Sequence, residues 1–140
     1  MSKTKIEDGN VILEFIGITV ALLVPISIIA NSSIMVANAY LSTDLSARTA
    51  ARAFVVSSSD VSGTRAAISS SKLTAHDFDP SNNSIETTIS CNKTPCLSPG
   101  GFVTVRVSKE VRLNLPKALG SRNLVVTSQH TAVVDELRSP

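Results

Sequence analysis

The feature that most constrains this chain is a long uncharged segment near its N-terminus. No charged residue occurs from Phe15 to Thr43, and the part up to Ala30 is strongly apolar. About 20 apolar residues are enough for a helix to cross the hydrocarbon layer of a bilayer. The sequence therefore predicts one membrane-spanning helix, with the carboxylate of Glu14 at its entrance.

No helix breaker follows this apolar run, so we expect the same helix to continue to about Val56. Pro25 lies inside it and removes one backbone hydrogen bond, which predicts a kink. Asp44, Arg48 and Arg52 follow one another at i, i+4 spacing and are expected to form a solvated face. Another stripe is expected to face the core of a following domain; it comprises Val36, Tyr40, Ala47, Ala50, Ala51 and Phe54.

The second half of the chain carries the alternation of apolar and polar residues that is typical of strands. It appears in three segments: "SIETTISC" (84–91), "FVTVRVSKEVRLNL" (102–115) and "NLVVTSQHTAVV" (123–134). Lys109 interrupts the apolar face of the second segment, where we expect a bulge or the end of the sheltered face. A short helix is expected in "SGTRAAISSSKL" (62–73). The predicted fold class is α+β, a long N-terminal helix followed by a small antiparallel sheet of about three strands that packs on Phe54.

Composition excludes several classes of function. The net charge is +2 and the 13 basic residues are scattered, so charge does not indicate a nucleic-acid partner. One Tyr and no Trp, with abundant Ser and Thr, fit a modest sheet with a polar face better than the deep core of an enzyme. The sequence contains no Gly-rich phosphate loop.

Candidate catalytic and metal-binding groups are few. His130 and Asp135 are not expected to form a catalytic triad with a serine. No G-x-S-x-G motif occurs, and strand alternation puts His130 and Asp135 on opposite faces. "HDFDP" (76–80) offers hard-metal ligands but is more typical of a turn. Arg106, Arg112 and Lys117 are expected on the solvated face of the second strand. We therefore predict no catalytic residue, no metal site and no cofactor.

Cys91 and Cys96 are the only cysteines and enclose a short turn that contains Pro95. Metal binding would need two further ligands, and His76 and His130 fall in other elements without suitable spacing. If this half of the chain lies outside the cytoplasm, a disulfide that closes a small loop is expected, with a stabilisation of about 2 kcal/mol.

The segment "DGNVILEF" (8–15) resembles the processing site of type IV pilin-like proteins. In that family a short hydrophilic leader ends in Gly, a prepilin peptidase cuts after it, and Glu is the fifth residue of the mature chain. Here Gly9 would end the leader, Asn10 would be the first residue and Glu14 the fifth. With Phe15 after the Glu, the proline in the helix and the short chain, the sequence looks most like the TadE-like pseudopilins of tight-adherence (Flp) pili.

The resemblance covers Met1 to about Val56, and the rest only in its pilin-like architecture. It implies a leader (1–9), a transmembrane and amphipathic helix (10–56) and an exported strand-rich domain (57–140). It also implies a minor structural component of a pilus, not an enzyme. Its partners would be the prepilin peptidase, the membrane platform and assembly ATPase of the pilus system, the major pilin and other pseudopilins, and the membrane itself, with no nucleic acid.

The position of Glu14 has a physical explanation if the chain is cut after Gly9. The new α-ammonium of Asn10 would then lie next to the hydrocarbon layer, where an isolated charge is costly. Glu14, one helical turn away, would offset it within the subunit or in a neighbouring subunit, which sets the register of assembly.

Lys3 and Lys5 precede the helix, which predicts a leader in the cytoplasm and a second half outside a bacterial cytoplasmic membrane. The cell surface or the pilus is the second location that we consider. Two other interpretations stay open. "VANAY" (36–40) has an A-x-A arrangement, so signal peptidase would cut after Ala39 and release a small binding domain. Alternatively, the helix is an uncleaved single-pass anchor for an extracytoplasmic domain that binds a cell-wall partner.

Overall fold

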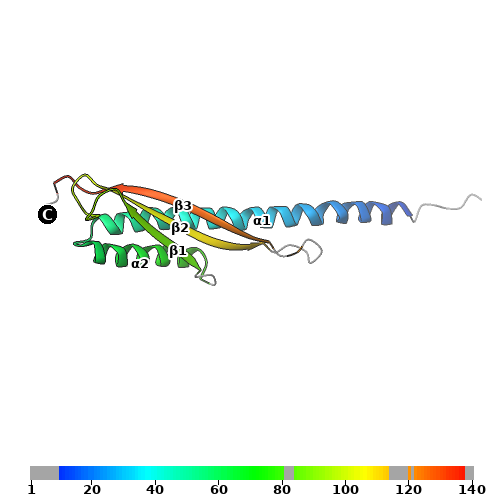
Figure 1. The fold of residues 1–140 in the computed structure, drawn as a ribbon. Helices are drawn as coiled ribbons and strands as arrows, with labels where there is room; N and C mark the ends of the chain where they lie inside the picture. Colours follow the sequence, from blue (N-terminus) through cyan, green and yellow to red (C-terminus); the bar gives the residue numbers. More distant parts are fainter. Residues whose placement is uncertain (1–9, 81–83, 114–119, 121, 138–140) are drawn as a thin grey trace, which may run out of the picture. The chain divides into compact units, whose positions relative to one another are not determined.

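The computed structural model describes residues 10–80, 84–113, 120 and 122–137. The elements follow in the order α1 (Asn10–Val55), α2 (Asp60–Phe78), β1 (Ile85–Cys91), β2 (Phe102–Leu113) and β3 (Arg122–Val133) (Figure 1). The fold class is α+β, as predicted. The chain divides after Ile34 into two units, so that α1 contributes its first part to one unit and its second part to the other.

The first unit is the apolar part of α1, which is long and apolar enough to cross a membrane. The helix is continuous through Pro25, and the kink expected there stays a prediction. Polar side chains beyond the proline bond to the helix itself: Ser27 Oγ donates to the carbonyl of Leu23 and Asn31 Nδ2 to that of Ser27, both at 2.8 Å. Because these groups are satisfied internally, they do not prevent the helix from lying in an apolar medium.

The second part of α1 packs into the sheet domain through small side chains. Its buried stripe follows helical spacing and comprises Ala39, Ser42, Thr43, Ser46, Ala47, Ala50, Ala51 and Phe54. The prediction was wrong for Tyr40, which is 55% exposed, because steps of three and four residues from Phe54 lead to Thr43 and Ala39. On the exposed face, Arg48 Nε lies 3.0 Å from Asp44 Oδ2, as the i, i+4 spacing predicted.

α2 is longer than predicted and includes the whole of "SGTRAAISSSKL". It begins with a capping box, in which Ser59 Oγ accepts from the amide of Ser62 and Ser62 Oγ accepts from the amide of Ser59. The turn expected at "HDFDP" was wrong for its first residues, because His76, Asp77 and Phe78 are helical and Asp79 is the C-cap. The capping box therefore accounts for the earlier start of the helix, and at the other end the amide of Asp79 donates to the carbonyl of Ala75.

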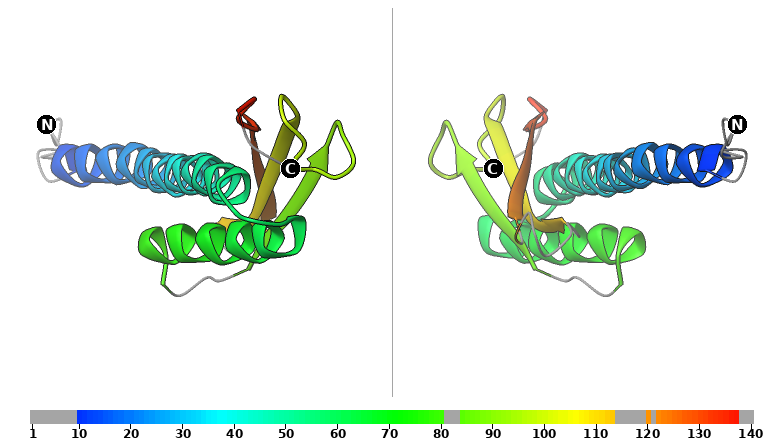
Figure 2. Two further views of the ribbon diagram at one scale, coloured as in Figure 1. Left: turned by 90° about the vertical axis from the view of Figure 1, so that its left-hand side faces the viewer. Right: turned by 90° about the vertical axis from the view of Figure 1, so that its right-hand side faces the viewer.

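α2 runs beside the second part of α1 (Figures 1 and 2). Its buried face consists of Gly63, Ala67, Ser71 and Ala75, one residue per turn. A Cβ at Gly63 would lie 3.1 Å from Cδ2 of Phe54, so a larger residue here would require the ring of Phe54 to shift by a few tenths of an ångström. On the same face, the hydroxyls of Ser71 and Thr87 of β1 lie 2.9 Å apart, so α2 packs through small residues on both the end of α1 and the sheet.

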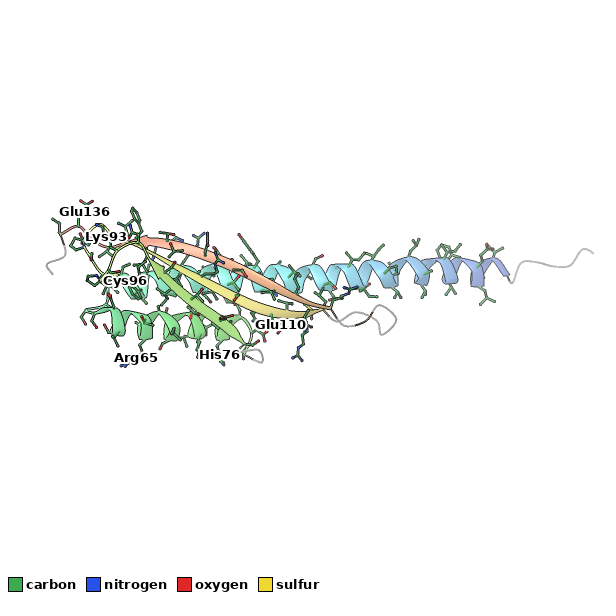
Figure 3. All side chains as sticks on the ribbon, in the orientation of Figure 1. Arg65, His76, Lys93, Cys96, Glu110 and Glu136 are labelled. Atoms are coloured by element: carbon green, nitrogen blue, oxygen red, sulfur yellow. A yellow bond between two sulfur atoms is a disulfide. The ribbon has the colours of Figure 1, made fainter. Side chains whose placement is uncertain are left out.

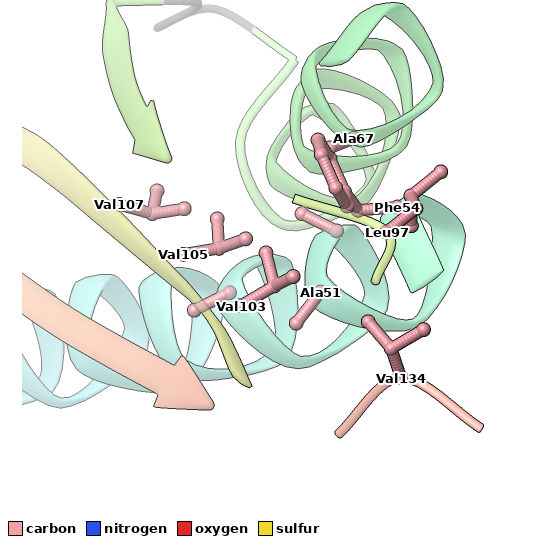
Figure 4. Close-up of a cluster of buried hydrophobic side chains, with 10 residues drawn as sticks. Ala51, Phe54, Ala67, Leu97, Val103, Val105, Val107 and Val134 are labelled. Atoms are coloured by element: carbon pink, nitrogen blue, oxygen red, sulfur yellow. The ribbon is translucent and has the colours of Figure 1, made fainter. Parts of the chain in front are cut away.

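The sheet has three strands in the order β1-β2-β3, all antiparallel, as predicted. Its inner face buries Val103, Val105 and Val107 against Ala51 and Phe54 of α1 (Figure 4). Ala67, Leu97 and Val134 complete this core, and Phe54 is its largest fully buried side chain. A smaller cluster joins Ala39 to Val111 and Val126.

The expected bulge at Lys109 is absent from the described strands. The residue keeps the regular register, opposite Ile85 on β1 and Val126 on β3. It points to the inner face and is only 4% exposed, with Nζ 3.2 Å from Oδ2 of Asp79. The carboxylate at the end of α2 therefore allows a cation to remain on the buried face.

Candidate functional site

The predicted processing and assembly residues lie at the start of α1. Gly9 is outside the described residues, and Asn10 is the first residue of the helix. Glu14 follows one turn later, about 6 Å along the axis, and both Glu14 and Phe15 are exposed. The backbone nitrogen of Asn10 is therefore within reach of a Glu14 carboxylate, which is the geometry that the proposed charge pair needs.

The surrounding surface of this part of α1 is apolar. The large side chains from Val11 to Ile29 that are exposed by about half or more include Leu13, Phe15, Leu22 and Ile26. No described residue of the chain covers them, since this whole hydrophobic window is unburied. Such a surface is long and apolar enough for a membrane span.

Cys91 and Cys96 are joined by a disulfide, with 2.05 Å between the sulfur atoms, as predicted. The loop is also tied to the start of α2, because the carboxylate of Asp60 accepts from the amides of Cys96 and Leu97 at 2.9 and 3.1 Å. No pattern in the sequence indicates this role of Asp60. The disulfide therefore belongs to a structural corner that fixes α2 to the end of β1.

The groups considered for catalysis are not brought together. His130 lies on the inner face of β3 opposite Val105, while Asp135 lies beyond the strand and its Oδ1 accepts from the amide of Leu137. His76 is in α2, far along the chain from both. Among the described residues, no group of three His, Cys, Asp or Glu side chains is arranged to hold a metal ion.

Two of the three basic residues expected on the solvated face are exposed on β2. Arg106 is exposed and donates to Oε1 of Gln129 on β3 at 3.1 Å, and Arg112 is exposed near the end of β2. Lys117 lies outside the described residues. Figure 3 shows Cys96 and Glu110 near opposite ends of the sheet domain.

A cleft of about 510 Å³ opens at the Glu110 end of this domain. Three elements line it: α1 through Met35, Asn38 and Ala39, the end of α2 through Phe78 and Asp79, and β2 from Lys109 to Arg112. The buried ion pair of Lys109 and Asp79 forms part of its wall. The sequence signal for this site is Lys109, a charged residue at an inward position of a strand, where a bulge or the end of the sheltered face was expected.

Comparison of the chain with models of protein families, with curated proteins and with solved structures finds no match. The function therefore has to be argued from the residues and contacts described above.

Proposed function

We propose that this protein is a minor pilin-like (pseudopilin) structural component of a tight-adherence or type IV-like pilus. In this proposal it is processed after Gly9 and assembled through its N-terminal helix. The observation that carries the proposal is that one continuous helix, Asn10–Val55, has an exposed apolar part and a second part that belongs to the core of the sheet domain. This division of one helix is what a pilin-like subunit requires.

Release by signal peptidase after Ala39 fits the structure less well. The bond from Ala39 to Tyr40 lies inside α1, and Ala39 is buried against Val111 and Val126. A cut there would remove this contact and would leave the first amides of the remaining helix without acceptors. Uncleaved anchoring agrees with the helix but gives no reason for Glu14.

The role proposed for Glu14 is to set the register of subunits. An ammonium and a carboxylate about 4 Å apart attract each other by roughly 4 kcal/mol at an effective dielectric constant near 20, before desolvation is subtracted. Because desolvation removes much of this gain, the net stabilisation is small, while a misplaced subunit leaves two unpaired charges in an apolar surrounding. The pair therefore favours one register over others more than it strengthens the assembly.

The proposal includes partners and a location. The prepilin peptidase would act on Gly9 and Asn10, the membrane platform and assembly ATPase would extract the subunit, and the major pilin and other pseudopilins would pack on the apolar part of α1. Before assembly the chain would be held in a bacterial cytoplasmic membrane with its sheet domain outside.

The first test is the intact mass and the N-terminal peptide of the protein purified from its own membranes. We expect the chain to begin at Asn10 and to stay in the membrane fraction. A chain that begins at Tyr40 would instead establish a secreted domain. A chain that retains Met1, together with normal pili after deletion of the gene, would establish a simple anchor.

The second test is the variant Glu14→Gln, which keeps the shape of the side chain and removes its charge. We expect normal cleavage and membrane retention but at least a severalfold loss of incorporation into pili, measured by immunoblot of sheared filaments. Glu86→Gln is the matched control, because Glu86 is exposed on β1 of the sheet domain. Equal incorporation of both variants and the wild-type chain would contradict the register role.

A further inference from the structure

We infer that the cleft between α1, the end of α2 and β2 binds residues 135–137 of a second copy of this chain. The segment would add to β2 as a short antiparallel strand, with Glu136 opposite Arg112. Leu137 would then lie opposite Val111 and face the apolar lining of the cleft. This inference goes beyond the proposed function, which assigns a contact to the first part of α1 and none to the sheet domain.

The cleft includes the part of β2 that continues beyond the end of β1. β1 pairs with β2 only as far as Lys109, whereas β2 itself continues to Leu113. The amide of Asn92 donates to the carbonyl of Phe102, so the even-numbered residues of β2 direct their backbone groups toward β1. Among the described residues, no strand lies beside Arg112 on this side. Its amide and carbonyl can therefore bond to an added strand.

Residues 135–137 lie at the other end of the sheet domain. They follow the end of β3, and Figure 3 shows Glu136 near the end opposite Glu110. Leu137 is 93% exposed, more than any other large hydrophobic side chain among the described residues. Glu136 is also exposed and forms no ion pair within the described part of the chain. The segment therefore offers a carboxylate next to an apolar side chain.

The cleft has the complementary groups in the matching order. Arg112 is exposed, lines the cleft and forms no ion pair with the residues that the structure describes. Residues directly opposite each other in an antiparallel pair place their side chains on the same face, so the carboxylate of Glu136 would meet the guanidinium of Arg112. Leu137, the next residue, would lie over Val111. The apolar lining around Val111 comprises Met35, Ala39 and Phe78.

The occupant is a second copy because the segment cannot reach the cleft of its own domain. Arg112 lies ten residues along β2 from Phe102, which is opposite Val133 at the end of β3. At about 3.4 Å per residue this is roughly 34 Å, whereas residues 134–137 span at most about 14 Å. Such a head-to-tail contact does not close into a pair, so each copy can bind another. Because three residues bury little area, the contact adds to the packing of copies already held close together in a membrane or filament.

The experiment uses the full chain, purified from membranes with and without heavy-isotope labelling, then mixed equally and reconstituted in vesicles. Arg112→Lys keeps the positive charge and supplies a primary amine that a zero-length carbodiimide couples to a nearby carboxylate. By mass spectrometry we expect a peptide that joins the introduced lysine of one chain to Glu136 of a chain with the other label. Arg106→Lys is the control and should give no such peptide, because Arg106 is exposed on the same strand but does not line the cleft.

Leu137→Ser tests the apolar half of the contact, because it leaves both reacting groups in place. We expect it to lower the yield of the coupled peptide about tenfold, since the burial of one leucine is lost from the contact. Leu73→Ser is its control, because Leu73 is exposed on α2 and does not line the cleft. The inference is overturned if no coupled peptide joins the two labels, if Arg106→Lys couples equally well, or if the two leucine variants give equal yields.

The same spectra give the N-terminus of the chain and so separate this inference from the proposed function. A chain that begins at Asn10 and shows no coupling between copies would refute the contact alone. Coupling between copies of a chain that retains Met1 would support the contact and refute processing after Gly9.

Discussion

Replacing Asp79 with Asn tests whether the buried cation of the sheet domain depends on a single carboxylate. Lys109 Nζ is 3.2 Å from Asp79 Oδ2, and the two side chains are 4% and 37% exposed, respectively. The partners are therefore unequal, because the carboxylate is open to water and the ammonium is not. Removing the charge of Asp79 leaves a buried ammonium, whereas removing Lys109 leaves a hydrated carboxylate.

This difference in exposure determines how much each substitution should lower the free energy of unfolding. Breaking a buried pair and leaving one charge uncompensated costs about 3 to 5 kcal/mol. The amide oxygen of the new Asn can still accept from the ammonium, so we expect Asp79→Asn to cost about 2 kcal/mol, less than the loss of a whole partner. Lys109→Met buries an apolar side chain of similar length and should cost about 1 kcal/mol or less.

The assay is thermal unfolding of the sheet in detergent, followed by circular dichroism, together with hydrogen exchange of the β2 amides. For a sheet domain of this size, about 2 kcal/mol corresponds to a decrease in Tm of roughly 10 °C. Glu86→Gln serves as the charge control, since Glu86 is exposed. The reasoning is refuted if Lys109→Met lowers Tm as much as, or more than, Asp79→Asn.

Two further predictions use the same unfolding assay. Ser46 Oγ is buried without a hydrogen-bond partner among the described residues, so Ser46→Ala should stabilise the domain by about 1 kcal/mol. Ser71→Ala breaks a 2.9 Å hydrogen bond to Thr87 and should destabilise the domain by about 1 kcal/mol. If both variants destabilise the domain, the hydroxyl of Ser46 has a hydrogen-bond partner and the prediction is wrong. Replacing both Cys91 and Cys96 with Ser should lower the free energy of unfolding by about 2 kcal/mol, the value for such a short loop. Reduction of the wild-type chain should lower Tm by the same amount as the double substitution. A decrease in Tm in only one of the two samples would contradict the prediction.

The sheet could be predicted from the sequence because its signal is local and repetitive. Val103, Val105 and Val107 alternate with polar residues, and such a period of two specifies both a strand and its buried face. The end of α1 was predicted to within one residue because no proline follows Pro25 in the helix, so the sequence indicates no earlier end. Periodicity therefore identified the elements and the face on which they pack.

The helix pairing could not be predicted in the same way. The buried face of α2 consists of Gly63, Ala67, Ser71 and Ala75, which are not hydrophobic enough to give an apolar stripe. They are buried because α2 lies against Phe54 of α1 at Gly63 and against β1 at Ser71, and neither contact follows from a local pattern. Tyr40 was misplaced for the opposite reason, since an aromatic residue near the stripe is apolar but lies outside the contact.

The bulge expected at Lys109 was wrong because the carboxylate that pairs with its buried ammonium is distant in the sequence. Asp79 is 30 residues away in sequence, and only the packing of α2 on the sheet domain brings the two groups within 3.2 Å. A charged residue at an inward position of a strand predicts either an interruption or a partner, and the sequence alone does not distinguish them. The cleft that contains the Lys109–Asp79 ion pair therefore could not be predicted from sequence patterns.

The two parts of α1 have opposite energetic requirements. Large apolar side chains such as Leu13, Phe15 and Leu22 are more than half exposed, and burying each fully is worth about 1.5 to 3 kcal/mol. The second part buries mainly Ala and Ser, which contribute little area and act through close packing with α2 and the sheet. Substitutions before Ile34 should consequently change retention in a membrane or filament without unfolding the sheet domain, and substitutions at Ala47 or Ala50 should do the reverse. The chain thus separates what holds it in an apolar environment from what determines its fold, although both lie on one helix.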